Sequence, residues 1–300
     1  MKLISWTFFI DMLGYRDING EINTEDKAKE FIDFMNQNKA IFDFSNSESV
    51  KEIYKNNKQF DLYEFYDIKY SFISDSLVIN LSPKEVESLT IERKKNMHSA
   101  NALFIVLMRL QSFIYSCFKE KELFLRGGIS TKYCYLDNNF AVGEGLIDAY
   151  HTESKVAVHP RIAFSDSVFS DKKLLKEVEF LGNEMYGRSI LKCDEKGVYY
   201  LDYLGYNMSC VDRNHKMVCQ AILKNFNAYM SNLESSKLFV NRHAVAISNK
   251  LSELKIRKLA LSSDEERYNL QRVIDKFEWL KGYHNSAIKD FSDFKEFVVE

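Results

Sequence analysis

The sequence predicts an α+β fold, in which a sheet is flanked by helices and is followed by a hairpin and a helical extension. Three observations support this prediction. Apolar runs of strand length recur through the first two thirds of the chain, and longer segments with helical apolar spacing lie between them. From residue 212 to residue 300 the pattern is helical, with mixed charge and without proline. We therefore predict two domains, residues 1–205 and residues 206–300.

The first predicted strand covers residues 3–13 and contains the run "WTFFIDMLGY". A nearly continuous apolar run is typical of a strand at the centre of a sheet, where both faces are covered. The segment "NTEDKAKEFIDFMNQN" then predicts a helix with Asn23 or Thr24 as its N-cap, because acidic residues follow directly. A short helix is predicted over residues 50–56.

Residues 65–74 and 76–81 predict two strands joined in a tight hairpin, with Asp75 at its bend. The other predicted elements are a long apolar helix over 99–119, two strands within 122–143 joined by a turn at 137–139, a helix over 144–154, a strand over 159–165 and a hairpin over 189–204 with its turn at 195–197.

Composition gives a first indication of the functional class. The formal net charge of the 300 residues is −2, so no overall basic field indicates nucleic-acid or anionic-membrane binding. The five cysteines are an odd number without C-x-x-C spacing, which favours free thiols in a reducing cytoplasm. No stretch has the order of a signal peptide, and the longest apolar helix carries Arg109 and Gln111. We expect a cytoplasmic protein without direct membrane binding.

Asp11 and Asp75 each interrupt an apolar strand pattern. Alone, Asp11 is equally typical of a solvated strand end, and Asp75 of a turn residue. If the first strand lies beside the hairpin, however, the two carboxylates are neighbours and repel each other unless a cation compensates. Hard divalent ions held by carboxylates, water and phosphate oxygens give that compensation and suit displacement at phosphorus.

The residues after Asp11 strengthen this interpretation. Gly14 in "MLGY" lets backbone N–H groups approach a ligand closely, and a helix is expected shortly afterwards. We therefore expect Met12, Leu13, Gly14 and Tyr15 to form a cradle for phosphate.

Four motifs occur in the order that they have in the catalytic domain of class III nucleotide cyclases. They are "FFIDMLGY" (8–15), "FISDSLVI" (72–79), "LRGGIS" (125–130) and "FAVGEGLIDAYHTES" (140–154). With "RGG" and a late "WLKGYHN", the chain most resembles the bacterial pyrimidine cyclases of the Pycsar antiphage system. The resemblance covers about residues 3–205 and the late motif.

This resemblance implies a ferredoxin-like sheet that works as a head-to-tail homodimer with nucleotide sites between subunits. It implies two Mg²⁺ or Mn²⁺ ions per site, with Asp11, Asp75 and the Met12 carbonyl as ligands. One ion would favour ionisation of the ribose 3′-OH, and the other would neutralise the triphosphate as that oxygen attacks the α-phosphorus.

The chain departs from purine cyclases at the positions that select the base. Ser71 and Phe140 stand there, and neither matches the pairs that read adenine or guanine. One interpretation is that these are ordinary strand residues in a shifted register. The other, which we favour, is a pocket rebuilt for another base and narrowed by Tyr70 or Phe140.

A second departure concerns the transition state. Purine cyclases carry an Asn and an Arg four residues apart on the helix after the glycine turn, where this chain has Ile147 and His151. Arg126 is the first candidate to replace that charge, and the alternative is an Arg held by a structural carboxylate such as Glu153. Lys192 falls near the position of the family's triphosphate-binding Lys.

Three functions remain open from the sequence. The first is an enzyme that makes cyclic CMP or cyclic UMP from CTP or UTP, as a second messenger read by a separate effector protein. The second is a catalytically reduced dimer of the same fold that binds nucleotide and signals through its helical extension. The third is a two-metal phosphohydrolase or nucleotidyl transferase of another fold, for which we would expect further Asp or His ligand clusters.

Overall fold

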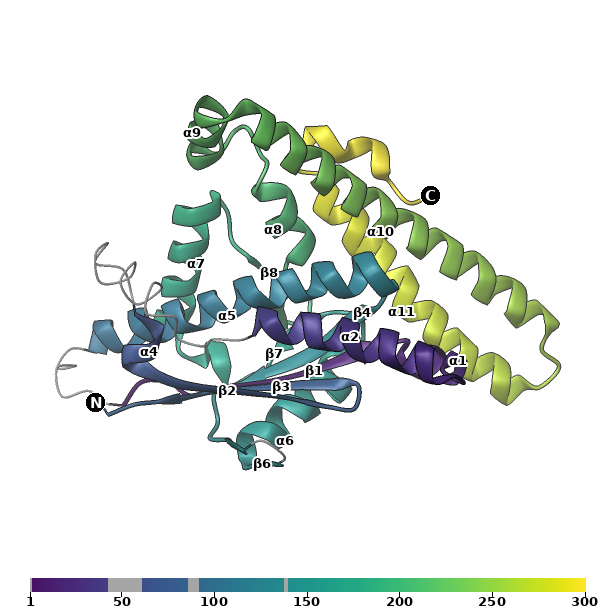
Figure 1. Cartoon of the computed structure of the whole chain (residues 1–300), viewed down its shortest axis with the longest axis horizontal. Coiled ribbons are helices and arrows are strands. Elements are labelled where there is room, and N and C mark those ends of the chain that lie inside the picture. Colours follow the sequence, from purple (N-terminus) through teal and green to yellow (C-terminus); the bar gives the residue numbers. More distant parts are fainter. Residues whose placement is uncertain (1, 43–60, 86–91, 138–139) are drawn as a thin grey trace. The chain divides into compact units, whose positions relative to one another are not determined.

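Strand β1 (Trp6–Leu13) is an interior strand of a seven-stranded sheet with the order β2-β3-β1-β4-β7-β9-β8 (Figure 1). It pairs antiparallel with β3 (Ser76–Pro83) on one side and with β4 (Phe124–Ser130) on the other. β2 (Tyr66–Ile73) pairs antiparallel with β3, whereas β4 and β7 (Ile162–Phe164) run parallel. The sheet is therefore mostly antiparallel and is flanked by helices, which confirms the predicted α+β class.

The computed structural model describes residues 2–42, 61–85, 92–137 and 140–300, and it divides into two compact units. Unit 1 comprises Met1–Ala157, Arg161–Leu181 and Cys193–Tyr200. Unit 2 comprises Val158–Pro160, Gly182–Lys192 and Leu201–Glu300. The predicted domains, 1–205 and 206–300, remain a prediction about which segments fold independently.

β1 is apolar because both faces of the strand are covered. Trp6, Phe8 and Ile10 are fully buried on one face, where helices α2 (Glu25–Ile41) and α5 (Glu92–Lys121) lie (Figure 1). The Trp6 Nε1–H donates to the Ser99 carbonyl of α5 at 3.1 Å. On the other face lies α6 (Glu144–His151), whose Tyr150 ring meets the Phe9 ring edge-on. This arrangement explains the continuous apolar run around Asp11.

Local signals placed several elements correctly. Thr24 caps α2, since its side chain accepts a hydrogen bond from the Lys27 N–H, and α1 (Tyr15–Glu21) precedes it.

Helix α5 is longer than the predicted 99–119, and by length and composition it is the one described helix able to cross a membrane. Of the apolar window that qualifies it, 61% is buried in the fold, so here α5 serves as a core helix.

The segment after β4 differs from the prediction. The two strands expected within 122–143 are three, because β4 ends at Ser130 and β5 (Tyr135–Asp137) and β6 (Phe140–Val142) form a separate hairpin. The Ser130 hydroxyl causes the break, as it donates to Asp148 Oδ2 at 2.6 Å and accepts from the Lys132 N–H at 3.1 Å. These bonds take the backbone out of the ladder.

Helix α6 is also shorter than the predicted 144–154. It passes into a π-helical turn, η1 (Thr152–Ala157), and β7 follows. Three further helices were not predicted, namely α4 (Leu62–Phe65), α7 (Lys172–Tyr186) and α8 (Tyr203–Ser209). The helix predicted over 50–56 lies outside the described residues.

The structure confirms the predicted hairpin and the predicted helical extension. β8 (Leu191–Cys193) and β9 (Tyr199–Leu201) are neighbours in the sheet and carry the chain between the units. After them come α9 (Lys216–Lys224), α10 (Phe226–Ala260), α11 (Asp264–Ile288) and the short helix η3 (Ser292–Phe297). α10 and α11 form an antiparallel pair, with a 2.7 Å ion pair between Lys255 and Glu278.

A chain of buried hydrogen bonds joins four elements of unit 2. The Tyr203 hydroxyl lies 2.7 Å from His243 Nε2, His243 Nδ1 lies 3.0 Å from His284 Nδ1, and His284 Nε2 lies 2.8 Å from the Phe297 carbonyl. The carbonyl only accepts, so His284 donates from Nε2 and accepts at Nδ1. His243 then donates from Nδ1 and accepts the Tyr203 O–H at Nε2. The chain is thus complete with both imidazoles neutral.

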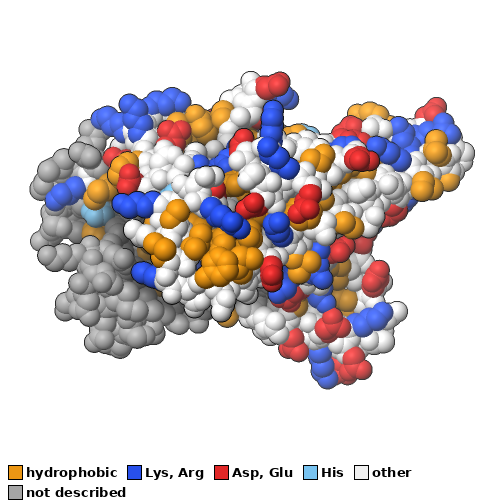
Figure 2. All heavy atoms as spheres, turned by 90° about the horizontal axis from the view of Figure 1, so that it is seen from above, with side chains coloured by type: hydrophobic (Ala, Val, Ile, Leu, Met, Phe, Trp, Pro, Cys, Tyr) orange, Lys and Arg blue, Asp and Glu red, His pale blue; other side chains and the backbone are white. Residues whose placement is uncertain are grey.

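Surface charge is mixed, in keeping with the small net charge. Figure 2 shows Lys and Arg side chains intermingled with Asp and Glu over most of the described part of the face that it presents.

Candidate functional site

Asp11 lies near the end of β1 and directly opposite one residue on each neighbouring strand. Its partners in the register are Ser76 on β3 and Arg126 on β4. Directly opposite residues in antiparallel strands project to the same face, so the three side chains share a face of the sheet. This is the face that α6 and η1 cover.

Arg126 contacts two carboxylates. Its Nη2 lies 3.3 Å from Asp11 Oδ2 and also contacts Glu153 Oε1 of η1. The Glu153 side chain is 3% exposed, whereas those of Asp11 and Arg126 are 19% and 17% exposed. A buried carboxylate costs several kcal/mol unless it is paired, so Glu153 needs this guanidinium more than Asp11 does. The three groups together carry one negative charge.

One donor of Arg126 is unused among the residues that the structure describes. Its Nε–H is buried and has no hydrogen-bond acceptor among the described residues. A buried donor without an acceptor is costly and points to a missing partner, such as water or a ligand oxygen.

Asp75 lies at the same end of the sheet as Asp11. It follows Ser74 in the two-residue turn between β2 and β3, and Ser74 adopts a left-handed φ of 58°. The Asp75 carbonyl accepts a 3.1 Å hydrogen bond from the Met12 N–H. The predicted hairpin with Asp75 at its bend is thus confirmed, and its turn is tied to the residue after Asp11.

The carboxylates of Asp11 and Asp75 fit a hard divalent cation in their chemistry and their charge. Both residues are partly exposed, Asp11 on β1 and Asp75 in the turn that leads into the neighbouring strand β3, and Arg126 leaves an excess of negative charge around Asp11. Two carboxylates completed by water and phosphate oxygens are the usual environment of Mg²⁺. Within the described residues no three His, Cys, Asp or Glu side chains are grouped to hold a metal ion.

The predicted phosphate cradle has a partly different form. Gly14 is the N-cap of α1 with a left-handed φ of 94°, and the Met12 N–H is already bonded to Asp75. Leu13 pairs with Phe124 at the end of β1, and the Tyr15 ring packs against Phe31 of α2 at 5.5 Å. Tyr15 serves the packing of two helices, and the phosphate cradle stays a prediction.

The predicted base-selecting residues lie away from Asp11. Tyr70 and Ser71 are on β2, with β3 between them and β1, and the Tyr70 ring lies 6.1 Å from that of Phe42. Phe140 begins β6 and is 74% exposed. The structure therefore does not bring Ser71 and Phe140 together with Asp11 within one chain.

Ile147 and His151 share one face of α6, one helical turn apart, and both are exposed. The opposite face of α6 packs on the sheet through Gly145 and Ala149, which are buried. A Cβ on Gly145 would collide with the Lys132 carbonyl, so glycine is needed for this close approach.

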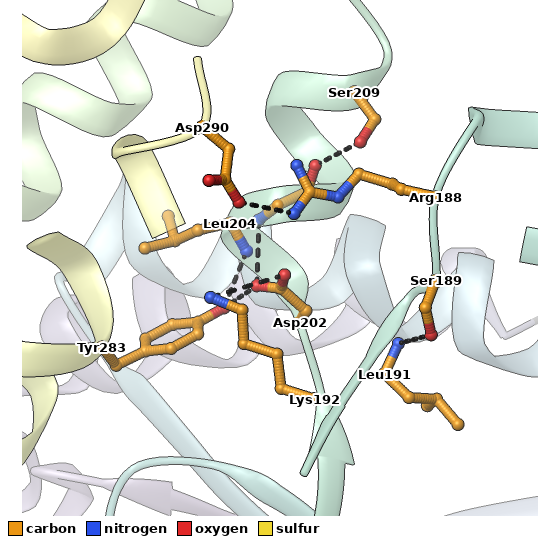
Figure 3. A network of polar contacts seen from close by, with 10 residues as sticks. Arg188, Ser189, Leu191, Lys192, Asp202, Leu204, Ser209, Tyr283 and Asp290 are labelled. Carbon is orange, nitrogen blue, oxygen red and sulfur yellow. Dashed lines mark hydrogen bonds and ion pairs between the residues drawn. The ribbon is translucent and has the colours of Figure 1, made fainter. Parts of the chain in front are cut away.

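Lys192 belongs to unit 2 and contacts a buried carboxylate there (Figure 3). Its Nζ lies 3.8 Å from Asp202 Oδ2 and 5.4 Å from the centre of the Tyr283 ring. Asp202 also accepts from the Tyr283 hydroxyl at 2.8 Å and from the Gly205 N–H at 3.1 Å. The late motif "WLKGYHN" contains Tyr283 and His284, but its pattern did not reveal either of the two buried networks to which they belong.

Comparisons with known proteins give structural likeness without a sequence match. No protein-family model and no curated protein sequence matches the chain. The catalytic core of a rhodopsin-guanylyl cyclase with converted specificity, in complex with ATPαS, is similar at 15% identity and a TM-score of 0.37, over 67% of this chain and 96% of that one. The guanylyl cyclase Cya2 is similar at 11% identity and a TM-score of 0.32, over 67% and 92%. Neither likeness assigns a family.

Proposed function

We propose that this protein is a nucleotide cyclase that converts CTP or UTP into the 3′,5′-cyclic monophosphate and pyrophosphate. The observation that carries the proposal is the placement of Asp11 on β1 beside the β2–β3 turn that holds Asp75, with a bond from the Met12 N–H to the Asp75 carbonyl. Four sequence motifs in cyclase order support it independently.

In this proposal Asp11 and Asp75, with the Met12 carbonyl, hold two Mg²⁺ or Mn²⁺ ions, which when bound favour ionisation of the ribose 3′-OH and neutralise the triphosphate. The 3′-oxygen attacks the α-phosphorus, the bond to the β-phosphate oxygen breaks, and pyrophosphate leaves with that oxygen. Arg126 faces the charge that develops on the phosphate, and its Nε–H has no acceptor within the described chain. Glu153 holds the guanidinium in place.

The active form in this proposal is a head-to-tail homodimer. Tyr70, Ser71 and Phe140 lie apart from Asp11 in one chain, so the base must be read by residues of a second copy. Exposed apolar side chains on β6 and α6, which contact each other, offer a surface for that copy: Phe140, Val142, Ile147 and Tyr150. Burying such side chains between subunits removes apolar area from water.

The finer assignments follow from the resemblance alone. The product would be cyclic CMP or cyclic UMP, acting in the cytoplasm as the second messenger of Pycsar antiphage defence and read by a separate effector protein. A nucleotide-binding dimer without catalysis is the second candidate, favoured by one observation: α6 presents Ile147 and His151 where purine cyclases carry Asn and Arg.

The test is product analysis. The full chain is incubated with each of the four NTPs and Mg²⁺ or Mn²⁺, and the products are separated by chromatography. We expect cyclic CMP or cyclic UMP from the native chain and none from Asp75→Asn. Asp67→Asn is the control and should still give the product, because Asp67 forms a surface ion pair with Lys84 at the other end of the hairpin. Nucleotide binding without product would support the second candidate, and a linear product or free phosphate would contradict both.

A further inference from the structure

A pocket of about 450 Å³ opens in unit 1 at the end of the sheet away from Asp11 and Asp75. Its wall includes Ser5 just before β1, Ser82 near the end of β3 and Thr131 just after β4. Figure 1 shows the N-terminal segment and the β2–β3 turn at opposite ends of these strands. Ser5 and Asp11 are six residues apart, or roughly 20 Å along an extended strand. The pocket is therefore separate from the proposed catalytic site.

The pocket offers mainly hydrogen-bond donors. Lys2 and Lys95 bring two ammonium groups, and Thr131 and Tyr133 bring two hydroxyls. Across the described ranges of the chain these four side chains form no ion pair or hydrogen bond. Lys95 is half-buried, so its charge is less well hydrated than that of an ordinary surface lysine.

The acidic residue in the wall does not neutralise these lysines by contact. Asp171 caps α7, where its Oδ1 accepts from the Lys173 N–H at 2.9 Å and its Oδ2 from the Asn96 amide at 3.4 Å. Both of its oxygens are therefore engaged in the fold. The charges of the wall sum to +1, and each of the four unused side chains can donate a hydrogen bond, the two lysines without being able to accept one.

A complementary ligand is anionic and rich in acceptors, which describes a phosphate group. The Tyr133 ring adds a second element, since it is 63% exposed and offers a flat apolar surface. Stacking on such a ring favours a planar base. The volume lies within the range of pockets for small molecules.

We propose that this pocket binds a small phosphorylated molecule with a planar ring, of the nucleoside monophosphate class. Lys2 and Lys95 bind its phosphate, Thr131 donates to the phosphate or sugar, and Tyr133 stacks on the ring. This inference does not depend on the proposed cyclase activity.

Calorimetric titration of the full chain with AMP, GMP, CMP and UMP, and with inorganic phosphate, tests the proposal. The titrations are made without divalent ions and repeated with Asp11→Asn/Asp75→Asn, which disables the proposed catalytic site. We expect at least one monophosphate to bind the native chain and the double variant equally. Lys95→Ala should weaken that binding roughly tenfold or more, because it removes a charged hydrogen bond.

Lys94→Ala is the matched control, because Lys94 is the exposed neighbour of Lys95 on α5 and does not line the pocket. It should leave the affinity unchanged, and Tyr133→Ala should weaken the monophosphate but not inorganic phosphate. The proposal is overturned if no monophosphate binds, if Lys95→Ala and Lys94→Ala behave alike, or if binding is lost in the double variant. Equal affinity for inorganic phosphate and every monophosphate would also overturn it, since no ring would then be recognised.

Discussion

Asp11 and Arg126 face each other across β1 and β4, with 3.3 Å between Asp11 Oδ2 and Arg126 Nη2. The same guanidinium contacts Glu153, so one cation serves two carboxylates that come from different elements. The orientation of Arg126 is thereby fixed by the fold itself, before any ligand is bound.

Removing Arg126 should destabilise unit 1 strongly, because Glu153 would keep a buried, unpaired charge. We expect Arg126→Gln to lower the free energy of unfolding by about 3 kcal/mol, measured by urea denaturation. Glu153→Gln in the same chain should recover part of that loss. The control Lys132→Gln breaks a more exposed pair with Asp148 and should cost less than about 1 kcal/mol. Strict additivity of the two substitutions would contradict the pairing.

Gly128 should tolerate no side chain. A Cβ there would collide with the Ala149 carbonyl and lie 2.8 Å from the Glu153 backbone nitrogen, so α6 and η1 would have to move away from β4. We expect Gly128→Ala to cost about 2–3 kcal/mol in thermal unfolding. Gly20→Ala is the control, because Gly20 lies in α1 with nothing within 4 Å of a Cβ. It should be neutral or slightly stabilising, and equal effects of the two variants would speak against this packing.

Lys192→Met distinguishes two roles for Lys192. Its contact with the buried Asp202 predicts a lower midpoint of thermal unfolding, since the carboxylate would lose its nearest cation. The KM for nucleotide should stay unchanged if this is its whole role. A raised KM with an unchanged unfolding midpoint would support triphosphate binding instead. Lys196→Met, in the exposed turn between β8 and β9, serves as the control for charge alone.

Unit 2 should lose stability as the pH falls below about 6.5. Burial lowers the pKa of His243, and the neighbouring His284 lowers it further. Burial also lowers the pKa of His284, although the hydrogen bond to the Phe297 carbonyl acts in the opposite direction. The unfolded chain, with an ordinary histidine pKa near 6.5, then binds more protons than the folded chain. This stabilisation is present above about pH 6.5 and is lost below it.

Urea denaturation at pH 7.5 and pH 5.5 measures this loss. The hydrogen-bond partners of the two rings include the Tyr203 hydroxyl and the Phe297 carbonyl, and neither of these two groups supplies a negative charge to a protonated imidazole. His243→Gln should reduce the dependence on pH, whereas His151→Gln, at an exposed histidine, should keep it. An unchanged dependence in His243→Gln would contradict the prediction.

A charge on the apolar surface of α6 should prevent the proposed dimer. Ile147 is 68% exposed, so Ile147→Glu is expected to leave the fold intact and to shift sedimentation toward the monomer. Leu259→Glu is the control, because Leu259 is 85% exposed near the end of α10. If both variants sediment as the native chain does, this surface does not join two copies.

Features set by local signals were predictable from the sequence. The run around Phe8 and Ile10 identified a strand covered on both faces, Thr24 marked a helix start, and the spacing around Asp75 gave the turn. Each depends on a few neighbouring residues, so no distant contact was needed to find it.

Features that depend on distant contacts were not settled by the sequence. The partner of Arg126 stayed open because Glu153 reaches it only through a π-helical turn, which has no clear sequence signal. The role of Lys192 was suggested by the resemblance alone, and its contact with Asp202 of unit 2 could not be found from the sequence. The break after Ser130 required the side chain of Asp148, which is 18 residues away.

The pairing of α10 with α11 has a consequence for limited proteolysis. Residues 261–263 join the two helices without helical structure of their own, and Leu259 beside them is exposed. A protease should cut there first. The two fragments should nevertheless stay associated through gel filtration, because α10 and α11 contact each other, both bury apolar side chains, and the buried bond between His243 and His284 joins them. Unit 2 would then keep its fold after the peptide chain between α10 and α11 has been cut.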